Sequence, residues 1–423
     1  MARPKNFSPT YRKHRNSARC LVNGRWIELG RFNSPESRAE FARIVAELAA
    51  SPATAIAPSN SPTVVQIIAA FWRHAEEHYR HPDGTQTGEL SGFRDSLRPL
   101  RKLYGHTPAC NFGPLALKTV RQSMIDDGLT RKLINQRIGR IKRVFRWAAS
   151  EELVPVEVHT ALTTVAGLQA GRSKAREAEP VLPVAEELVE ATLPFLNRHV
   201  RGLVQFQRLT GCRPGEACRL RRADIDMTGN AWSYRPARHK TAHRAKCRNI
   251  AVGPRAQSML REFLDVPPTE YLFSPKRAMA EFRASQRARR KTPVQVSQQA
   301  RQPKSMPKRQ PGARYTTRSY FRAVAIACER GFPLPLHLAR HDKESREEWE
   351  ARLTPEQRAE AEAWRKKHHW CPLQLRHTFA TTTRKLFNLE HAGAALGHSK
   401  MSATEVYAER DAGLALEVAA RIG

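Results

Sequence analysis

The stretch at residues 370–411 constrains the fold of this chain more than any other. Leu375, Phe379 and Leu386 recur there at the spacing of one helix face. Pro372 suits the first turn of that helix, because the N–H that proline lacks has no helical partner at this position. The stretch therefore begins with an amphipathic helix that packs its apolar face against a core.

Two polar residues are placed by this helix and the next. Arg376 lies beside the apolar face, so we expect its guanidinium group to face a cleft. A second helix is predicted at residues 389–396, because Gly397 suits the left-handed conformation that ends many helices. His398 follows this glycine directly, so the turn at the helix end sets its position.

A third, short helix is predicted from Ser402, which has the spacing of a capping box with Glu405. This helix carries Tyr407. The three predicted helices and their turns bring an arginine, a histidine and a tyrosine toward one place.

These motifs resemble the C-terminal boxes of the tyrosine recombinases, the phage-integrase family. The sequence reads L-R-H-T-F-A-T, then L-G-H-S, and Tyr407 follows His398 by nine residues. Each box alone occurs by chance, so the order and spacing of all three carry the resemblance. It implies a site-specific DNA recombinase that cuts and rejoins DNA and integrates or excises a mobile element.

Residues 210–217, T-G-C-R-P-G-E-A, resemble the first arginine box of the same family. Arg213 precedes Pro214, so its backbone is biased away from helical angles while the proline can begin a helix. Arg213 is therefore expected at a helix N-terminus, where N–H groups favour a phosphate. Glu216 is placed either to orient Arg213 or to cap the helix.

Two strands are predicted around the segment R-H-K-T-A-H-R-A-K, at residues 232–236 and 247–252. The family has a lysine in this hairpin, and Lys240 is the matching position. Lys246 is the competing candidate. Either lysine also suits a simple contact with a DNA phosphate.

The resemblance implies a chemical role for each of these residues. The planar guanidinium groups of Arg213 and Arg376 match the oxygens of a phosphodiester. Tyr407 is the implied nucleophile, and its 3′-phosphotyrosyl intermediate conserves the energy of the broken bond, so rejoining needs no ATP. Lys240 is the implied general acid for the departing 5′ oxygen. His398 is expected to donate a hydrogen bond to a non-bridging oxygen.

One position departs from the family pattern. The family usually has histidine three residues before the second-box arginine, whereas this chain has Leu373, which can neither donate nor accept a hydrogen bond. Proton acceptance from Tyr407 is therefore open. His377 is a supporting candidate, and His368 or His369 could reach the site from upstream. Two alternatives follow: a DNA-binding protein with impaired catalysis, and an enzyme that relaxes DNA like a type IB topoisomerase.

Composition favours a nucleic-acid partner. The chain has 423 residues, 72 of them Lys or Arg against 40 Asp or Glu, which gives a net charge of +32. No apolar run approaches the roughly 20 residues of a membrane-spanning helix, and the first residues lack the apolar core of a signal peptide. Seven cysteines without a C-x-x-C pair fit a reducing compartment. We therefore expect a cytoplasmic, nucleoid-associated protein with no membrane partner.

No cofactor and no metal are expected. His368, His369, Cys371 and His377 lie close together in sequence, but they lack the paired spacing of metal ligands. The resemblance implies double-stranded attachment sites as the partner, a homotetramer at synapsis, and accessory DNA-bending proteins.

The helix predicted at residues 130–152 has one apolar face and one strongly basic face. The basic residues are Arg137, Arg140, Lys142, Arg143 and Arg146. Such a helix can pack in a bundle and offer its cations to DNA phosphates or to a major groove. The alternative is a charged face in solvent, and the absence of acidic residues among these cations favours DNA.

The whole pattern predicts a mainly α fold with small β-sheets, in the α+β class. We expect a helical core-binding domain and a tyrosine-recombinase catalytic domain behind a small hairpin-and-helix module with an Asn23-Gly24 turn. The predicted parts are an arm-type DNA-binding module (residues 1–50), a linker (51–62), a helical core-DNA-binding domain (63–167), a second linker (168–183), and a catalytic domain (184–423) with a basic insertion near 276–368.

Overall fold

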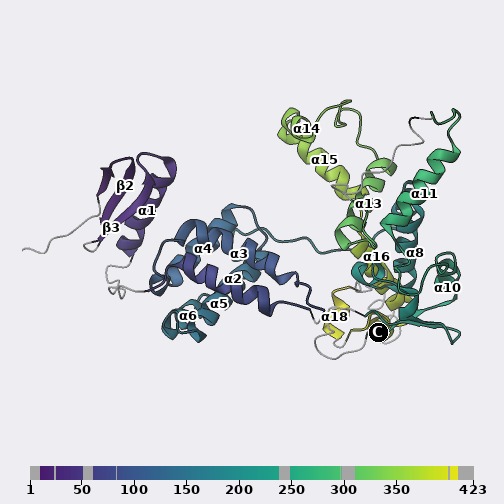
Figure 1. The fold of residues 1–423 in the computed structure, drawn as a ribbon, viewed down its shortest axis with the longest axis horizontal. Coiled ribbons are helices and arrows are strands. Elements are labelled where there is room, and N and C mark those ends of the chain that lie inside the picture. Colours follow the sequence, from purple (N-terminus) through teal and green to yellow (C-terminus); the bar gives the residue numbers. More distant parts are fainter. Residues whose placement is uncertain are drawn as a thin grey trace, which may run out of the picture. The chain divides into compact units, whose positions relative to one another are not determined.

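The computed structural model shows a mainly α fold with two small β-sheets, which confirms the predicted fold class (Figure 1). It contains two compact units, Met1–Glu179 and Pro180–Gly423. The boundary between them falls inside the predicted linker at 168–183, and the finer domain limits stay predictions. The residues that the structure describes are 10–22, 25–50, 61–81, 83–237, 248–295, 297, 310–398 and 401–407.

The first unit begins with a three-stranded antiparallel sheet and one helix. The elements are β1 (Tyr11–His14), β2 (Ser17–Val22), β3 (Arg25–Arg31) and α1 (Pro35–Ala50). Strands β2 and β3 form the predicted hairpin, with Val22 opposite Arg25; its Asn-Gly turn lies outside the described residues. Strand β1 was not predicted from the sequence. It is a strand because Tyr11 pairs with Cys20 and its hydroxyl lies 2.6 Å from Ser37 Oγ.

A bundle of helices completes the first unit. Its elements are α2 (Val64–His78), α3 (Glu89–Tyr104), the 3₁₀ helix η1 (Ala109–Asn111), α4 (Pro114–Asp126), α5 (Arg131–Ser150) and α6 (Val156–Thr163). Helix α5 contacts α2, α3, α4 and α6. Its residues Ile141 and Phe145 are therefore fully buried with Phe93 of α3 in one core. A helix surrounded in this way has little free surface, which limits how many of its cations can face a ligand.

The second unit consists mainly of helices, with one small antiparallel sheet of β4 (Ile225–Asp226), β5 (Trp232–Tyr234) and β6 (Ile250–Val252). Helix α8 contacts α10, α11, α13 and α16 and carries much of the core. None of the helices in the described part of the chain is long and apolar enough to cross a bilayer. The helices are α7 (Glu186–Thr192), η2 (Leu193–Phe195), α8 (Arg198–Thr210), α9 (Pro214–Ala217), η3 (Arg222–Asp224), α10 (Pro254–Arg261), α11 (Pro275–Ala288), α13 (Thr317–Gly331), α14 (Arg346–Arg352), α15 (Pro355–His368), α16 (Pro372–Leu386), α17 (Leu389–Leu396) and α18 (Met401–Glu405).

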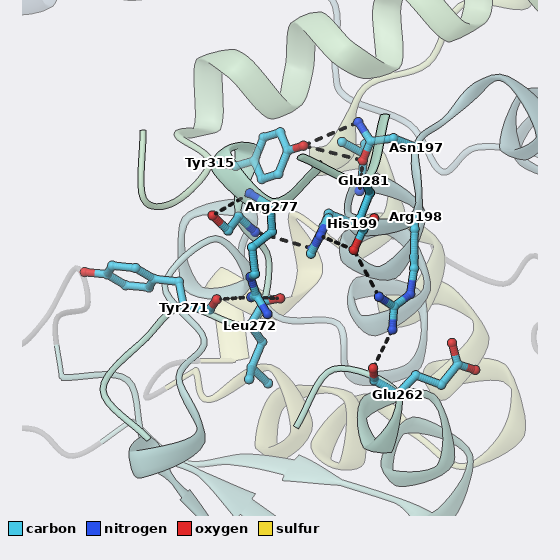
Figure 2. A network of polar contacts seen from close by, with 11 residues as sticks. Asn197, Arg198, His199, Glu262, Tyr271, Leu272, Arg277, Glu281 and Tyr315 are labelled. Atoms are coloured by element: carbon cyan, nitrogen blue, oxygen red, sulfur yellow. Dashed lines mark hydrogen bonds and ion pairs between the residues drawn. The ribbon is translucent and has the colours of Figure 1, made fainter. Parts of the chain in front are cut away.

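A polar network fixes the start of α11 to the start of α8 (Figure 2). Glu281 lies 3.2 Å from both Arg198 Nη1 and His199 Nε2. Arg277 donates to the backbone carbonyls of Tyr271 and Leu272 just before α11. Burial lowers the pKa of His199, although Glu281 opposes this change. The network anchors the first part of the predicted basic insertion to the core of the unit.

Helix α13, which lies within the predicted insertion, packs into the main core of the unit. The part of the insertion after it has a small core of its own, formed by Leu338, Trp349, Leu353 and Ala361. A helix is predicted to begin with a capping box at Thr354 and to run to about Lys367, and α15 confirms it; the broader extension of this helix back to Glu347 was wrong. The chain forms α14 and α15, which are separated because the side chain of Thr354 accepts a hydrogen bond from the backbone N–H of Gln357 and caps α15.

Candidate active site

Arg376 lies on α16 and is completely buried, with 0% of its surface exposed. Its Nη1 donates to the carbonyl of Gly211 at 2.7 Å, and its Nη2 donates to the carbonyl of Leu396 at 2.9 Å. The expectation that Arg376 faces an open cleft was therefore wrong. Burial, and then the nearby charge of Arg213, lower the pKa of Arg376 to about 10. The group keeps its charge at neutral pH in a place where that charge is costly.

Gly211 joins the two arginine boxes. It ends α8 in the left-handed conformation, with φ of 60°, so its carbonyl can meet Arg376. A Cβ atom at this position would lie 2.2 Å from Phe379 Cδ1 on α16. Only glycine allows both this backbone conformation and the close approach of α16.

Arg213 stands at the position predicted for it, immediately before α9. Its backbone N–H donates to Glu216 Oε2 at 2.8 Å, and its Nη1 donates to Glu216 Oε1 at 2.9 Å. Glu216 therefore both caps α9 and orients Arg213, which resolves the two roles left open by the sequence. The arginine side chain retains 29% exposure, whereas Glu216 is almost fully buried. A ligand can therefore reach Arg213 while the carboxylate supports it from within.

His398 follows Gly397, which ends α17 with φ of 65° as predicted. Its Nε2 lies 2.9 Å from Arg376 Nη2, and its Nδ1 lies 3.0 Å from Thr404 Oγ1. Because Arg376 can only donate, Nε2 accepts and the proton lies on Nδ1. Burial, and then the charge of Arg376, lower the pKa of His398 to about 4. The imidazole is therefore neutral at neutral pH.

Tyr407 reaches the same place, but not on a helix. Helix α18 begins at Met401 and ends at Glu405, so the predicted capping box at Ser402 was wrong and Tyr407 lies in the turn that follows. Its ring centroid lies 5.1 Å from Arg376 Cζ and 5.2 Å from the ring of His398. The structure thus brings together the arginine, histidine and tyrosine of the C-terminal boxes.

His377 packs against the other side of this cluster. Its ring centroid lies 4.6 Å from that of Tyr407, and the side chain is 5% exposed. Burial, and then the charge of Arg376, lower the pKa of His377, while a backbone hydrogen bond with Tyr407 opposes the change. His368, one of the two upstream candidates, instead packs against the ring of Trp364, and its Nδ1 lies 2.9 Å from the carbonyl of that residue. Of these two histidines, His377 is the one beside the tyrosine.

Two predicted lysines lie outside the described residues. These are Lys240 and its competitor Lys246, so their roles stay predictions. Leu373 occupies the first turn of α16 and is only partly buried. Its side chain brings no hydrogen-bonding group to the site.

Arg248 also belongs to this cluster, and the sequence did not identify it. Its Nε lies 3.7 Å from Glu216 Oε1, and its side chain is 4% exposed. Burial lowers its pKa, while Glu216 opposes this change. The available sequence signal was its place in the predicted strand 247–252, at the end of the hairpin that carries the predicted lysine.

The five cations of α5 are not equivalent. Arg140 is 8% exposed, and its Nη2 lies 3.3 Å from Glu89 Oε1 of α3. Lys142 donates to the carbonyl of Val165, and burial lowers its pKa. The remaining three are at least partly exposed, namely Arg137, Arg143 and Arg146.

Solved structures share this fold at low sequence identity. The integrase of transposon Tn1549, in complex with a circular intermediate DNA, is 16% identical, with a TM-score of 0.51 over 85% of this chain and 99% of that chain. The lambda integrase dimer bound to a COC′ core site is 12% identical, with a TM-score of 0.51 over 96% and 97% of the chains. The lambda integrase tetramer bound to a Holliday junction is 12% identical, with a TM-score of 0.51 over 94% of each chain. No protein-family profile and no curated protein sequence matches the chain.

Proposed function

We propose that this chain, which has the fold of tyrosine recombinases, is a site-specific DNA recombinase that integrates or excises a mobile element. Tyr407 attacks a DNA phosphate, a 3′-phosphotyrosyl bond forms, and the 5′ oxygen leaves. A 5′ hydroxyl of the partner duplex then attacks this bond and releases the tyrosine. The observation that carries the proposal is the position of the Tyr407 ring beside Arg376 and His398.

The charge of the cluster suits a phosphate in displacement. Three guanidinium groups, those of Arg213, Arg248 and Arg376, gather around the single carboxylate of Glu216. The negative charge on the non-bridging oxygens grows as the tyrosine attacks, and buried cations fixed in advance stabilise that charge strongly. Arg213 is the most accessible of these groups, so we assign it the first contact with the scissile phosphate.

The proton of Tyr407 needs an acceptor other than residue 373. His377 lies against the tyrosine ring, and because its pKa is lowered it is neutral near pH 7 and able to accept a proton. We assign this task to His377. Lys240 remains the proposed general acid that protonates the departing 5′ oxygen.

Binding of the duplex is assigned to both units. On α5 the exposed or partly exposed Arg137, Arg143 and Arg146 are proposed to contact phosphates. Arg140 is buried against Glu89 and Lys142 donates to the carbonyl of Val165, whereas Arg143 lies 3.7 Å from Glu89 but keeps 48% of its side chain exposed. A lambda integrase with this fold was solved as a tetramer on a Holliday junction. We propose four copies of this chain at synapsis, together with accessory proteins that bend the DNA.

Covalent trapping tests this function. A nicked duplex from the DNA flanking the encoding element lets the cleaved fragment diffuse away, so the adduct accumulates and is separated on a denaturing gel. We expect an adduct with the wild type and none with Tyr407→Phe. Tyr271→Phe is the matched control, because it removes the hydroxyl of another tyrosine of the same unit. A wild type that binds this DNA tightly without forming an adduct would contradict the proposal.

A second candidate function is DNA binding with little or no cleavage, and Leu373 is the observation that favours it. The variant Leu373→His separates the two candidates in the same trapping assay. If His377 already accepts the proton, the adduct forms at the wild-type rate. A large increase in the rate would show instead that the natural chain is an impaired enzyme.

A further inference from the structure

Arg248 is a buried guanidinium group to which the proposed reaction assigns no contact with the phosphate. Its Nη1 donates to the carbonyl of Asn249 at 3.1 Å, but its Nε and Nη2 are buried and make no hydrogen bond with the described part of the chain. Burying a charged group whose donors are incompletely satisfied costs free energy. If residue 248 only filled space in the core, an apolar side chain would do so at a lower cost in free energy. The buried charge therefore indicates a role beyond packing.

The guanidinium group lies against the turn that carries His398. A Cβ atom at Gly397 would lie 2.0 Å from Arg248 Nη1 and 2.9 Å from its Cζ. The same glycine has φ of 65°, so both the backbone conformation and the arginine require a residue without a side chain. Helix α17 contacts β6, the strand that Arg248 precedes. The turn is therefore held between its own helix and the arginine.

Arg248 also shares Glu216 with Arg213. Glu216 Oε1 lies 2.9 Å from Arg213 Nη1 and 3.7 Å from Arg248 Nε. The backbone carbonyl of Glu216 accepts a hydrogen bond from Tyr234 Oη at 2.9 Å, which ties α9 to strand β5. A displacement of Arg248 would thus act on Glu216 and on His398 together.

We propose that Arg248 is a positioning residue for DNA strand cleavage, which fixes His398 through the Gly397 turn and fixes Arg213 through Glu216. This inference rests on the proposed function of the same site. The contacts of Arg248 are with Glu216 and with the turn at Gly397, so its proposed effect on the phosphate is indirect. A planar guanidinium group fits flat against a turn and keeps a donor directed at the carboxylate, which the single ammonium group of lysine cannot do.

The charge of Arg248 has a separate, measurable consequence. Arg376, Arg213 and Arg248 all lower the pKa of His398, and Glu216 opposes them. Removal of the Arg248 charge should therefore raise the pKa of His398 toward its ordinary value. The acidic limb of the rate profile should then move to higher pH in a variant without this charge and stay in place in a variant that keeps it.

Two variants separate position from charge. Arg248→Met keeps the length and removes the charge, whereas Arg248→Lys keeps the charge and removes the planar group. The rate of adduct formation is measured in single turnover between pH 5 and pH 8.5, together with DNA affinity. Small displacements of catalytic groups cost up to about 100-fold in rate, and we expect a loss of this order for Arg248→Met with unchanged affinity. Arg248→Lys should also be slow but should keep the wild-type pH profile.

Arg277→Met is the matched control, because Arg277 is a half-buried arginine of the same unit that serves the separate network of Figure 2. It should leave the pH profile unchanged. A wild-type rate and pH profile for Arg248→Met would overturn the inference, and so would weaker DNA binding with a reduced salt dependence, which would indicate direct phosphate contact. If Arg248→Met does not fold, a wild-type rate for Arg248→Lys overturns it equally. Absence of an adduct with the wild type would instead reject the proposed function.

Discussion

Arg376 in the candidate active site and Arg140 in the helical bundle of the first unit are both buried arginines on amphipathic helices. Their acceptors differ. Arg140 lies against the carboxylate of Glu89, so most of its charge is compensated inside the protein. Arg376 donates to the neutral carbonyls of Gly211 and Leu396 and to His398 Nε2, so none of its described hydrogen bonds goes to a carboxylate. The kind of acceptor therefore distinguishes a structural arginine from one that can stabilise an anion, even when both are buried.

The electrostatic state of the two regions follows from this difference. Burial and Arg213 lower the pKa of Arg376 to about 10, which shows that its charged form is destabilised before a ligand binds. A phosphate would relieve that destabilisation, because an anion next to the cluster favours the charged form. In the bundle, Glu89 already provides the anion to Arg140 and, at 3.7 Å, to Arg143.

The largest effect is predicted for Arg376→Gln, which can still donate to one carbonyl but carries no charge. We expect the rate of adduct formation to fall about 10³-fold, as for loss of a fixed group that stabilises a developing oxyanion. DNA affinity should change little, since many other cations contact the backbone. Single-turnover trapping and a binding titration measure the two quantities. Equal losses of rate and affinity would show that Arg376 serves binding, which would remove the contrast with Arg140.

In the bundle, removal of the carboxylate next to Arg140 is predicted to lower the stability of the protein and to leave the rate of DNA cleavage unchanged. Glu89→Gln leaves Arg140 buried without its carboxylate, which should lower the free energy of unfolding by about 1–2 kcal/mol, allowing for the 41% exposure of Glu89. Adding Arg140→Met should restore most of the loss, because removal of both partners of a buried pair is often nearly neutral. Urea unfolding of the variants measures both changes.

Asp95→Asn on the same helix is the control for this pair. Its ion pair with Arg98 spans 3.8 Å between exposed side chains and should contribute less than about 0.5 kcal/mol. A Glu89→Gln variant as stable as Asp95→Asn would contradict the structural role of Arg140.

A smaller effect is predicted for the exposed cations of α5. Arg143→Ala and Arg146→Ala should each reduce the slope of log affinity against log salt by about 1, which corresponds to about eightfold weaker binding at 0.1 M salt. The cleavage rate at saturating DNA should not change. Arg358→Ala, an exposed arginine of α15, is the control and should leave the slope unchanged. If the α5 variants also leave the salt slope unchanged, the basic face of α5 faces solvent and does not contact the DNA.

The features that the sequence predicted correctly are those that depend only on residues close together in the chain. The end of α17 at Gly397 and the position of Arg213 before α9 follow from local backbone preferences. Burial of Arg376 could not be predicted in this way, because its acceptor Gly211 lies 165 residues earlier in the chain. The same reason applies to Arg140, whose partner Glu89 is 51 residues away.

Short elements were missed for a related physical reason. Strand β4 has two residues, and it is a strand only because β5 pairs with it. Arg248 became visible as part of the site only when β6 and the turn at Gly397 were placed together. Motif spacing could indicate which residues react, but not which residues hold them.

The smallest predicted effect concerns stability at acidic pH. The pKa of His398 is about 4 in the folded chain and near its ordinary value of about 6.5 in the unfolded chain. Between these values the unfolded chain binds more protons, so His398 makes stability fall as the pH falls from about 6.5 to about 4. Urea unfolding of His398→Asn at pH 7 and pH 5 should therefore show less acid destabilisation than the wild type, by under about 1 kcal/mol because the histidine is only half-buried. His391→Asn, an exposed histidine of α17, should behave like the wild type. An equal loss of stability in His398→Asn and the wild type would show that burial and the cations of the cluster do not lower the pKa of His398, and the contrast between this site and the compensated bundle would then rest on Arg376 alone.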